Sequence, residues 1–205
     1  LIPLLKELEF NQLGKRIIGK PIHQEQQMSL FGVDDKNENS QSQLSNFKAK
    51  NKDYTLIQSK EQHQNFVQEL SKHNEVAFDT ETDSLDVSVA ELLGISFCFK
   101  ESKAFYCDLS KDSSLLNLYE SFFCSNQLKI AHNLKYDYGV LLNKGMKLHG
   151  PFFDTMIAHY LIDPEQRHNL DQLSRNILKY DPIPIESLIG NKKKPNKSMK
   201  EVEIE

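Results

Sequence analysis

Two acidic side chains follow a short apolar run in the first half of the chain. The run at 76–78 leads into Asp79 and Glu81, which a single residue separates. Residues i and i+2 of a strand project from one face, so a strand here predicts that both carboxylates lie side by side. Such carboxylates repel each other unless a cation lies between them, and hard ions such as Mg²⁺ bind oxygen ligands of this kind. The alternative is that Asp79 begins an ordinary turn, a position that Asp favours.

A second polar cluster lies at 131–137, where a short strand is expected to end and a helix to begin. Asn133 is expected to cap the helix N-terminus. Asp137 comes four residues later, so it shares a helical face with Asn133 and is expected to point toward the strand edge. Together with Asp79 and Glu81, it completes a set of three carboxylates that predicts a divalent-metal site. The alternative is a capped amphipathic helix on which Asp137 is solvated.

The elements that must position these acids are expected from residue 54 onward. The hydrophobic pattern predicts strands and helices in alternation: strands at 54–57, 75–79, 92–99, 104–107 and 128–131, and helices at 59–72, 113–124, 133–144, 155–162 and 170–179. Asp154 is expected to cap the helix that follows it. This order predicts an α/β fold class, a mixed sheet with helices packed against it.

The chain before residue 53 differs in composition. Residues 1–19 place apolar side chains near helical spacing, and we expect the tail of a preceding domain, because one helix cannot bury its apolar face alone. Residues 20–52 are rich in Gln, Asn, Ser, Lys and Asp and are predicted to be a flexible linker. Residues 53–205 would then form one incomplete domain, and the sequence would be an internal piece of a longer protein.

The overall composition excludes several classes of protein. The 205 residues carry 25 Lys and Arg against 29 Asp and Glu, a net charge of −4, so contacts with nucleic acid must be local. No apolar run approaches the roughly 20 residues that span a bilayer, so no membrane partner is expected. The three cysteines lack metal-ligand spacing and are expected to be reduced thiols in a cytoplasm. The Lys-rich run at 192–197 is either a phosphate contact or a solvated loop.

The two acidic clusters resemble motifs of a known family. The segment 78–85, Phe-Asp-Thr-Glu-Thr-Asp-Ser-Leu, resembles the first motif of the 3′-5′ exonuclease domain of family A DNA polymerases, the bacterial DNA polymerase I family. The segment 132–137, His-Asn-Leu-Lys-Tyr-Asp, resembles the second motif. Residues 153–156 and 163–173 resemble the helices that follow in this family, and 1–19 resembles the end of the 5′ nuclease region that precedes it.

This resemblance implies an RNase H-like fold, truncated at its C-terminal end, and hydrolysis assisted by two Mg²⁺ ions, for which Mn²⁺ is expected to substitute. Asp79, Glu81 and Asp137 would be the catalytic residues and the metal ligands. Asp79 would bridge both ions. Glu81 would bind the first ion and help to orient the attacking water, and Asp137 would hold the second ion, directly or through water.

The resemblance also implies a substrate and partners. Thr82 and Leu85 would contact the terminal nucleotide, and Asn133 would support either the substrate or the helix that carries Asp137. A single-stranded or frayed DNA 3′ end suits such a site, because a paired end must first be opened. The implied activity is proofreading during DNA replication and repair in a bacterial cytoplasm, in one chain with polymerase and 5′ nuclease domains.

The family's third motif, a Tyr followed four residues later by an Asp, has no counterpart after Asn191. The isolated fragment is therefore expected to be inactive. Two alternatives remain: a catalytically silent domain that serves as a structural or DNA-binding spacer, and a free-standing RNase D-like exonuclease. The intact acids favour an enzyme, because a spacer needs no clustered carboxylates, and the expected helix and linker before residue 53 disfavour a free-standing nuclease.

Overall fold

The computed structural model describes residues 53–190 and 197–204 of the chain. These residues all belong to a single unit, Leu44–Glu205. The expected tail at 1–19, the expected linker at 20–52 and most of the Lys-rich run lie outside the described residues. No helix in the described ranges is long and apolar enough to cross a membrane.

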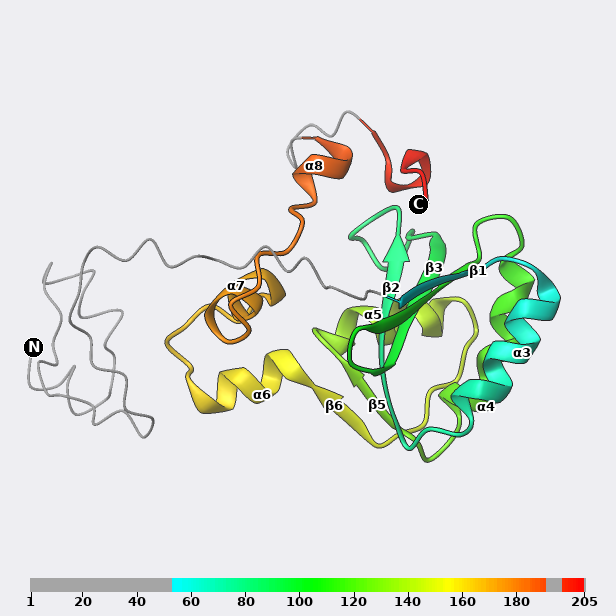
Figure 1. The fold of residues 1–205 in the computed structure, drawn as a ribbon, viewed down its shortest axis with the longest axis horizontal. Helices are drawn as coiled ribbons and strands as arrows, with labels where there is room; N and C mark the ends of the chain where they lie inside the picture. The colour runs from blue at the N-terminus through cyan, green and yellow to red at the C-terminus, as the bar shows by residue number, and fades with distance from the viewer. Residues whose placement is uncertain (1–52, 191–196, 205) are drawn as a thin grey trace, which may run out of the picture. The chain divides into compact units, whose positions relative to one another are not determined.

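Six strands form one mixed sheet in the order β1-β4-β3-β2-β5-β6 (Figure 1). They are β1 (Asp53–Ile57), β2 (Glu75–Thr82), β3 (Leu92–Lys100), β4 (Lys103–Asp108), β5 (Leu128–Ala131) and β6 (Phe152–Asp154). The β2–β3 and β3–β4 pairs are antiparallel, whereas the β1–β4, β2–β5 and β5–β6 pairs are parallel. The mixed sheet confirms the predicted fold class, and β6 is a strand that the sequence did not predict.

The helical elements follow the predicted order with shifted ends. They are α3 (Lys60–Leu70), the 3₁₀ helix η1 (Ser113–Tyr119), α4 (Glu120–Phe123), α5 (Leu134–Asn143), α6 (Thr155–Ile162), α7 (Leu170–Asn176), α8 (Glu186–Ile189) and the 3₁₀ helix η2 (Met199–Glu201). The helix predicted at 113–124 is instead η1 followed by a short α4. Neither α8 nor η2 was predicted.

Local sequence explains why α3 begins where it does. The Ser59 hydroxyl accepts from the Gln62 amide at 3.2 Å, and the Gln62 side chain accepts from the Ser59 amide at 2.9 Å. This reciprocal pair satisfies amides of the first turn that have no partner within the helix. Phe66 then packs into the core, with its ring centroid 4.7 Å from that of Phe105 in β4. Such aromatic pairs add to the stability that burial of apolar area provides.

Alternation along the strands separates the two faces of the sheet. Val76, Phe78 and Thr80 of β2 are buried, whereas Asp79 is exposed. Helices α3 and α4 lie on the same side of the sheet (Figure 1), where the buried aromatic residues form the core.

The opposite face of the sheet carries residues that are less buried. We call it the acidic face and define it by four residues of β2, β3 and β4: Asp79, Glu81, Ser96 and Tyr106. Strand register places Asp79 opposite Ser96, and Ser96 opposite Tyr106, so these three form one row across the sheet. All four residues are exposed or half-buried.

Candidate active site

Asp79 and Glu81 both lie within β2, which continues to Thr82 and is longer than predicted. In the ladder with β3, Asp79 lies opposite Ser96 and Glu81 opposite Gly94. The alternative that Asp79 begins a turn is therefore wrong. Both acids belong to the acidic face, and a register shift follows immediately after Glu81, so that Thr82 pairs with Leu92.

Asp137 reaches this strand from the first turn of α5. Its side chain is only 2% exposed, and one carboxylate oxygen, Oδ1, accepts hydrogen bonds from Thr80. The donors are the Thr80 amide at 3.0 Å and the Thr80 hydroxyl at 2.6 Å. The alternative of a solvated Asp137 is wrong, because this side chain joins α5 to β2 at the residue between the two strand acids.

The three carboxylates influence one another electrostatically. Burial, followed by repulsion from Asp137 and Glu81, raises the pKa of Asp79 to about 7. Asp79 is also exposed at the sheet surface, so solvent screens part of this effect. Burial, then repulsion from Asp137, raises the pKa of Glu81. Burial also raises the pKa of Asp137, although the hydrogen bonds from Thr80 act against the rise. Each charge is therefore costly here without a compensating cation.

The donor set suits a hard divalent ion, because it consists of carboxylate oxygens whose repulsion a cation would relieve. In the part of the chain that the structure describes, however, no three His, Cys, Asp or Glu side chains are arranged closely enough to hold an ion. The side chains thus have the chemistry of a metal site, but in this structure the three carboxylates are not close enough together to bind one ion.

The predicted capping role of Asn133 is wrong. Asn133 precedes α5 with a left-handed φ of 65°, and its side chain makes no capping hydrogen bond. The carboxylate of Asp154, at the end of β6, accepts instead from the amides of Asn133 at 3.2 Å and Leu134 at 2.9 Å. The Asn133 side chain thus makes no capping hydrogen bond to α5 and lies exposed beside the site.

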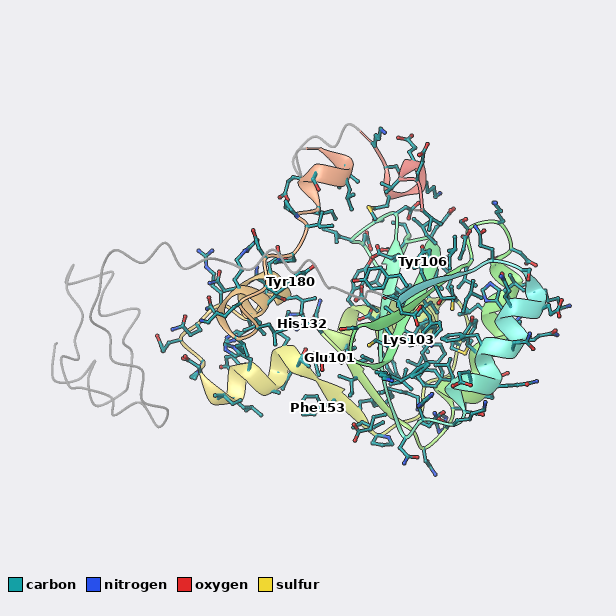
Figure 2. The ribbon with its side chains drawn as sticks, in the orientation of Figure 1. Glu101, Lys103, Tyr106, His132, Phe153 and Tyr180 are labelled. Carbon is teal, nitrogen blue, oxygen red and sulfur yellow. The ribbon has the colours of Figure 1, made fainter. Side chains whose placement is uncertain are left out.

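Asp154 also caps α6, as the sequence predicted. Its side chain accepts from the amides of Met156 at 2.8 Å and Ile157 at 3.3 Å. One carboxylate therefore organises the N-termini of both α5 and α6. Nearby, the His132 Nδ1 lies 2.8 Å from the Thr155 hydroxyl and joins the end of β5 to α6 (Figure 2).

Thr82 and Leu85 differ in their availability. The Thr82 hydroxyl lies 2.5 Å from the Tyr136 hydroxyl and donates to the Ser84 carbonyl at 3.1 Å, so it is engaged within the protein. Leu85 is 92% exposed, and its side chain is free to contact a ligand. Of the predicted substrate-binding residues, Leu85 and Asn133 are thus the accessible ones.

The loop after Thr82 is closed by polar contacts that the sequence did not indicate. The Glu91 amide donates to the Asp83 carboxylate at 2.8 Å, and the Asp83 amide donates to the Glu91 carbonyl at 3.3 Å. Lys200 pairs with both carboxylates, at 3.0 Å from Asp83 and 2.5 Å from Glu91. These ion pairs fasten the segment around η2 to the loop beside the acids.

A cavity of about 960 Å³ adjoins this loop. Its lining includes Glu81, Tyr106 and Asp108 from the sheet, and Met199 and Lys200 from the segment around η2. Tyr106 lies near the end of β2 in Figure 2. The sequence analysis predicted no function for this residue. No local pattern could have found it, because an aromatic residue in a strand is ordinarily a packing residue.

Comparison with known proteins gives a family for this arrangement. A family model described as 3′-5′ exonuclease matches residues 54–202. Among curated proteins, DNA polymerase I of Borreliella burgdorferi is 34% identical over 170 residues, which cover 80% of this chain and 19% of that protein. The chain therefore spans about a fifth of the length of this relative.

Solved structures with the same fold include nucleases. Escherichia coli RNase D matches with a TM-score of 0.55 at 19% identity, covering 66% of this chain and 36% of that chain. Brucella melitensis NrnC with bound Mg²⁺ matches with a TM-score of 0.51 at 20% identity, covering 64% of this chain and 63% of that chain. At such low identity, the likeness shows the RNase H-like fold alone.

Proposed function

Since this chain belongs to the 3′-5′ exonuclease family matched over residues 54–202, a family of hydrolytic enzymes, we propose that it is the proofreading module of a DNA polymerase I. Its substrate would be a DNA 3′ end that is single-stranded or frayed during replication and repair. The reaction would be hydrolysis of the terminal phosphodiester. The observation that carries this proposal is that Asp79 and Glu81 of β2 and Asp137 of α5 lie near enough for repulsion from Asp137 to act on both strand acids, with the pKa of each of the three raised.

These three carboxylates would hold divalent ions, with Mg²⁺ as the physiological ion and Mn²⁺ as a substitute. Such ions supply charge stabilisation and lower the pKa of a bound water. Asp79 would serve both ions, because repulsion from both other acids acts on it. Glu81 would orient the attacking water, and Asp137 would hold the second ion through the oxygen that Thr80 does not use. Small rotations of these side chains would be needed to close the site.

The substrate would lie along the accessible residues near the acids. Leu85 would pack against the terminal base, since its exposed apolar side chain otherwise costs hydration free energy. Asn133 would contact the sugar or phosphate, because its side-chain amide is not used in capping. Thr82 would act by holding the loop through Tyr136 and Ser84, and not only through a direct contact.

The rest of the parent protein is also part of the proposal. Residues 1–19 would end a 5′ nuclease domain, 20–52 would form a flexible linker, and 53–205 would form the exonuclease domain, followed by a polymerase domain in a bacterial cytoplasm. Homology to DNA polymerase I over about a fifth of that protein's length supports this organisation.

The test is the double change Asp79→Ala and Glu81→Ala. We expect this variant to fold, to lose Mn²⁺ binding in calorimetry, and, in the full-length protein, to stop shortening a 5′-labelled oligonucleotide from its 3′ end. Unchanged Mn²⁺ affinity would refute the metal-site assignment. Matched DNA and RNA oligonucleotides in the same assay would decide between a polymerase proofreader and an RNase D-like nuclease, and a fully silent parent protein would indicate a spacer.

A further inference from the structure

The side chain of Tyr106 in β4 packs with the tip of its ring over Gly94 of the neighbouring strand β3. A Cβ atom built on Gly94 would lie 2.3 Å from the Tyr106 hydroxyl oxygen and 2.4 Å from the ring carbon that bears it. No side chain fits at that distance, so the tip of Tyr106 occupies the space that a side chain at position 94 would otherwise fill. The absence of a side chain on Gly94 is what allows the phenol to reach this place.

That place is beside Glu81. Gly94 is the residue directly opposite Glu81 in the β2–β3 ladder. Directly opposed residues of antiparallel strands have Cβ atoms about 4.5–5.5 Å apart. The Tyr106 hydroxyl, 2.3 Å from that Cβ position, therefore lies on the same face of the sheet as the Glu81 side chain and close to it, without a hydrogen bond between these two residues in the structure. Both side chains line the cavity at the end of the sheet.

The hydroxyl is available as a hydrogen-bond donor. A tyrosine hydroxyl has an ordinary pKa of about 10, so the phenol of Tyr106 keeps its proton near neutral pH. A protonated phenol donates one hydrogen bond, and a carboxylate can only accept. Hydrogen bonds to an ionised acceptor are the stronger kind.

We propose that Tyr106 is a positioning residue of the exonuclease site: when the three acids close around a metal ion, its hydroxyl donates to the Glu81 carboxylate and fixes the direction in which that carboxylate presents its free oxygen. The inference rests on the proposed function, because it assumes that Glu81 is a metal ligand. It adds a residue from β4 to a site otherwise built from β2 and α5. Partners of this kind set ligand orientation, and their loss typically lowers metal affinity or activity by about 10–100-fold.

The test is Tyr106→Phe in the full-length protein, with Tyr160→Phe as the matched control. Tyr160 of α6 is 54% exposed, and its ring lies against that of His168. We expect Tyr106→Phe to lower kcat about tenfold with KM unchanged, and to weaken Mn²⁺ binding in calorimetry about tenfold. The control should match the wild type in all three values. Because Phe keeps the ring over Gly94, the melting temperature should change little.

A double-mutant cycle with Glu81→Ala separates positioning from packing, because Ala leaves no acceptor for the Tyr106 hydroxyl. If Tyr106 acts through Glu81, Tyr106→Phe weakens Mn²⁺ binding in the wild-type background and has no further effect beside Glu81→Ala. Wild-type kcat and Mn²⁺ affinity in Tyr106→Phe, or losses that add fully to those of Glu81→Ala, would overturn the proposal. If Glu81→Ala itself keeps full activity and Mn²⁺ affinity, the proposed function is wrong, and the role of Tyr106 is wrong with it. If Glu81→Ala loses both while Tyr106→Phe does not, only the role of Tyr106 is wrong.

Discussion

The amide and the hydroxyl of Thr80 both donate to the same carboxylate oxygen of Asp137, at 3.0 and 2.6 Å. These bonds join residues 57 positions apart and place α5 against β2 at the point between Asp79 and Glu81. Thr80 is 6% exposed and Asp137 is 2% exposed, so the contact is made inside the protein. The position of the third acid relative to the first two is thus set by a residue that is not itself acidic.

Replacing Thr80 by Val tests this connection. The change preserves the shape of the side chain and removes the hydroxyl donor, which leaves a buried carboxylate with one partner fewer. A hydrogen bond to a charged group contributes about 1.5–3 kcal/mol, so we expect the free energy of unfolding in urea to fall by about 2 kcal/mol. Thr80→Ser keeps the donor and should retain most of that stability. A Val variant as stable as the wild type would show that the bond contributes little.

The raised carboxylate pKa values predict an unusual dependence of stability on pH in a chelating buffer. A pKa of about 7 for Asp79 in the folded state exceeds the usual unfolded value of about 3.9, so the native state binds more protons between these limits. The stabilising contribution of Asp79 is complete below about pH 4 and is lost as the pH rises through about 7. Glu81 and Asp137 shift in the same direction.

Asp79→Asn isolates this contribution, because the amide resembles the protonated acid at every pH. We expect the stability of Asp79→Asn relative to the wild type to rise between about pH 4 and about pH 7, as measured by urea unfolding. Acids with lowered pKa, such as Asp83 and Asp86, act oppositely at low pH but are common to both proteins. A stability difference that stays constant across this range would contradict the raised pKa of Asp79.

The double capping role of Asp154 gives a third prediction. Loss of an N-cap costs typically about 1 kcal/mol, and Asp154→Ala removes the side-chain caps of both α5 and α6, so we expect a loss of about 2 kcal/mol. Activity of the full-length protein should also fall, because α5 carries Asp137. Asp112→Ala is the matched control, since Asp112 caps only η1, through the Ser114 amide at 3.0 Å. Equal losses in the two variants would mean that Asp154 does not serve both helices.

The ion pairs of Lys200 with Asp83 and Glu91 give a fourth prediction, which amide hydrogen exchange measures. Lys200→Ala removes the ion pairs to Asp83 and Glu91, so the amides of those two residues should exchange faster. Added salt should reproduce part of this effect in the wild type, because surface ion pairs are screened. Lys111→Ala, another lysine that lines the cavity, should leave this exchange unchanged. Identical protection in Lys200→Ala and the wild type would show that the loop closes without Lys200.

Short-range patterns in the sequence were sufficient to place the acids on their elements. The period of a strand predicted that Asp79 and Glu81 project from one face, and the burial pattern of β2 agrees, because the intervening Thr80 is buried while Asp79 is exposed. The position of Asp137 in a helix followed equally from its own segment. These predictions succeed because the faces of a strand or helix depend on residues only two to four positions apart.

Contacts between distant residues were decided by the tertiary structure alone. Asn133 has the residue type of a cap, yet Asp154, 21 residues later, takes that role because the parallel pairing of β5 and β6 brings Asp154 level with Ala131. The approach of Tyr106 to Glu81 depends likewise on the register that sets Gly94 opposite Glu81. Strand register depends on packing of the whole sheet against its helices, so no local spacing in the sequence could encode which side chain would stand beside which acid.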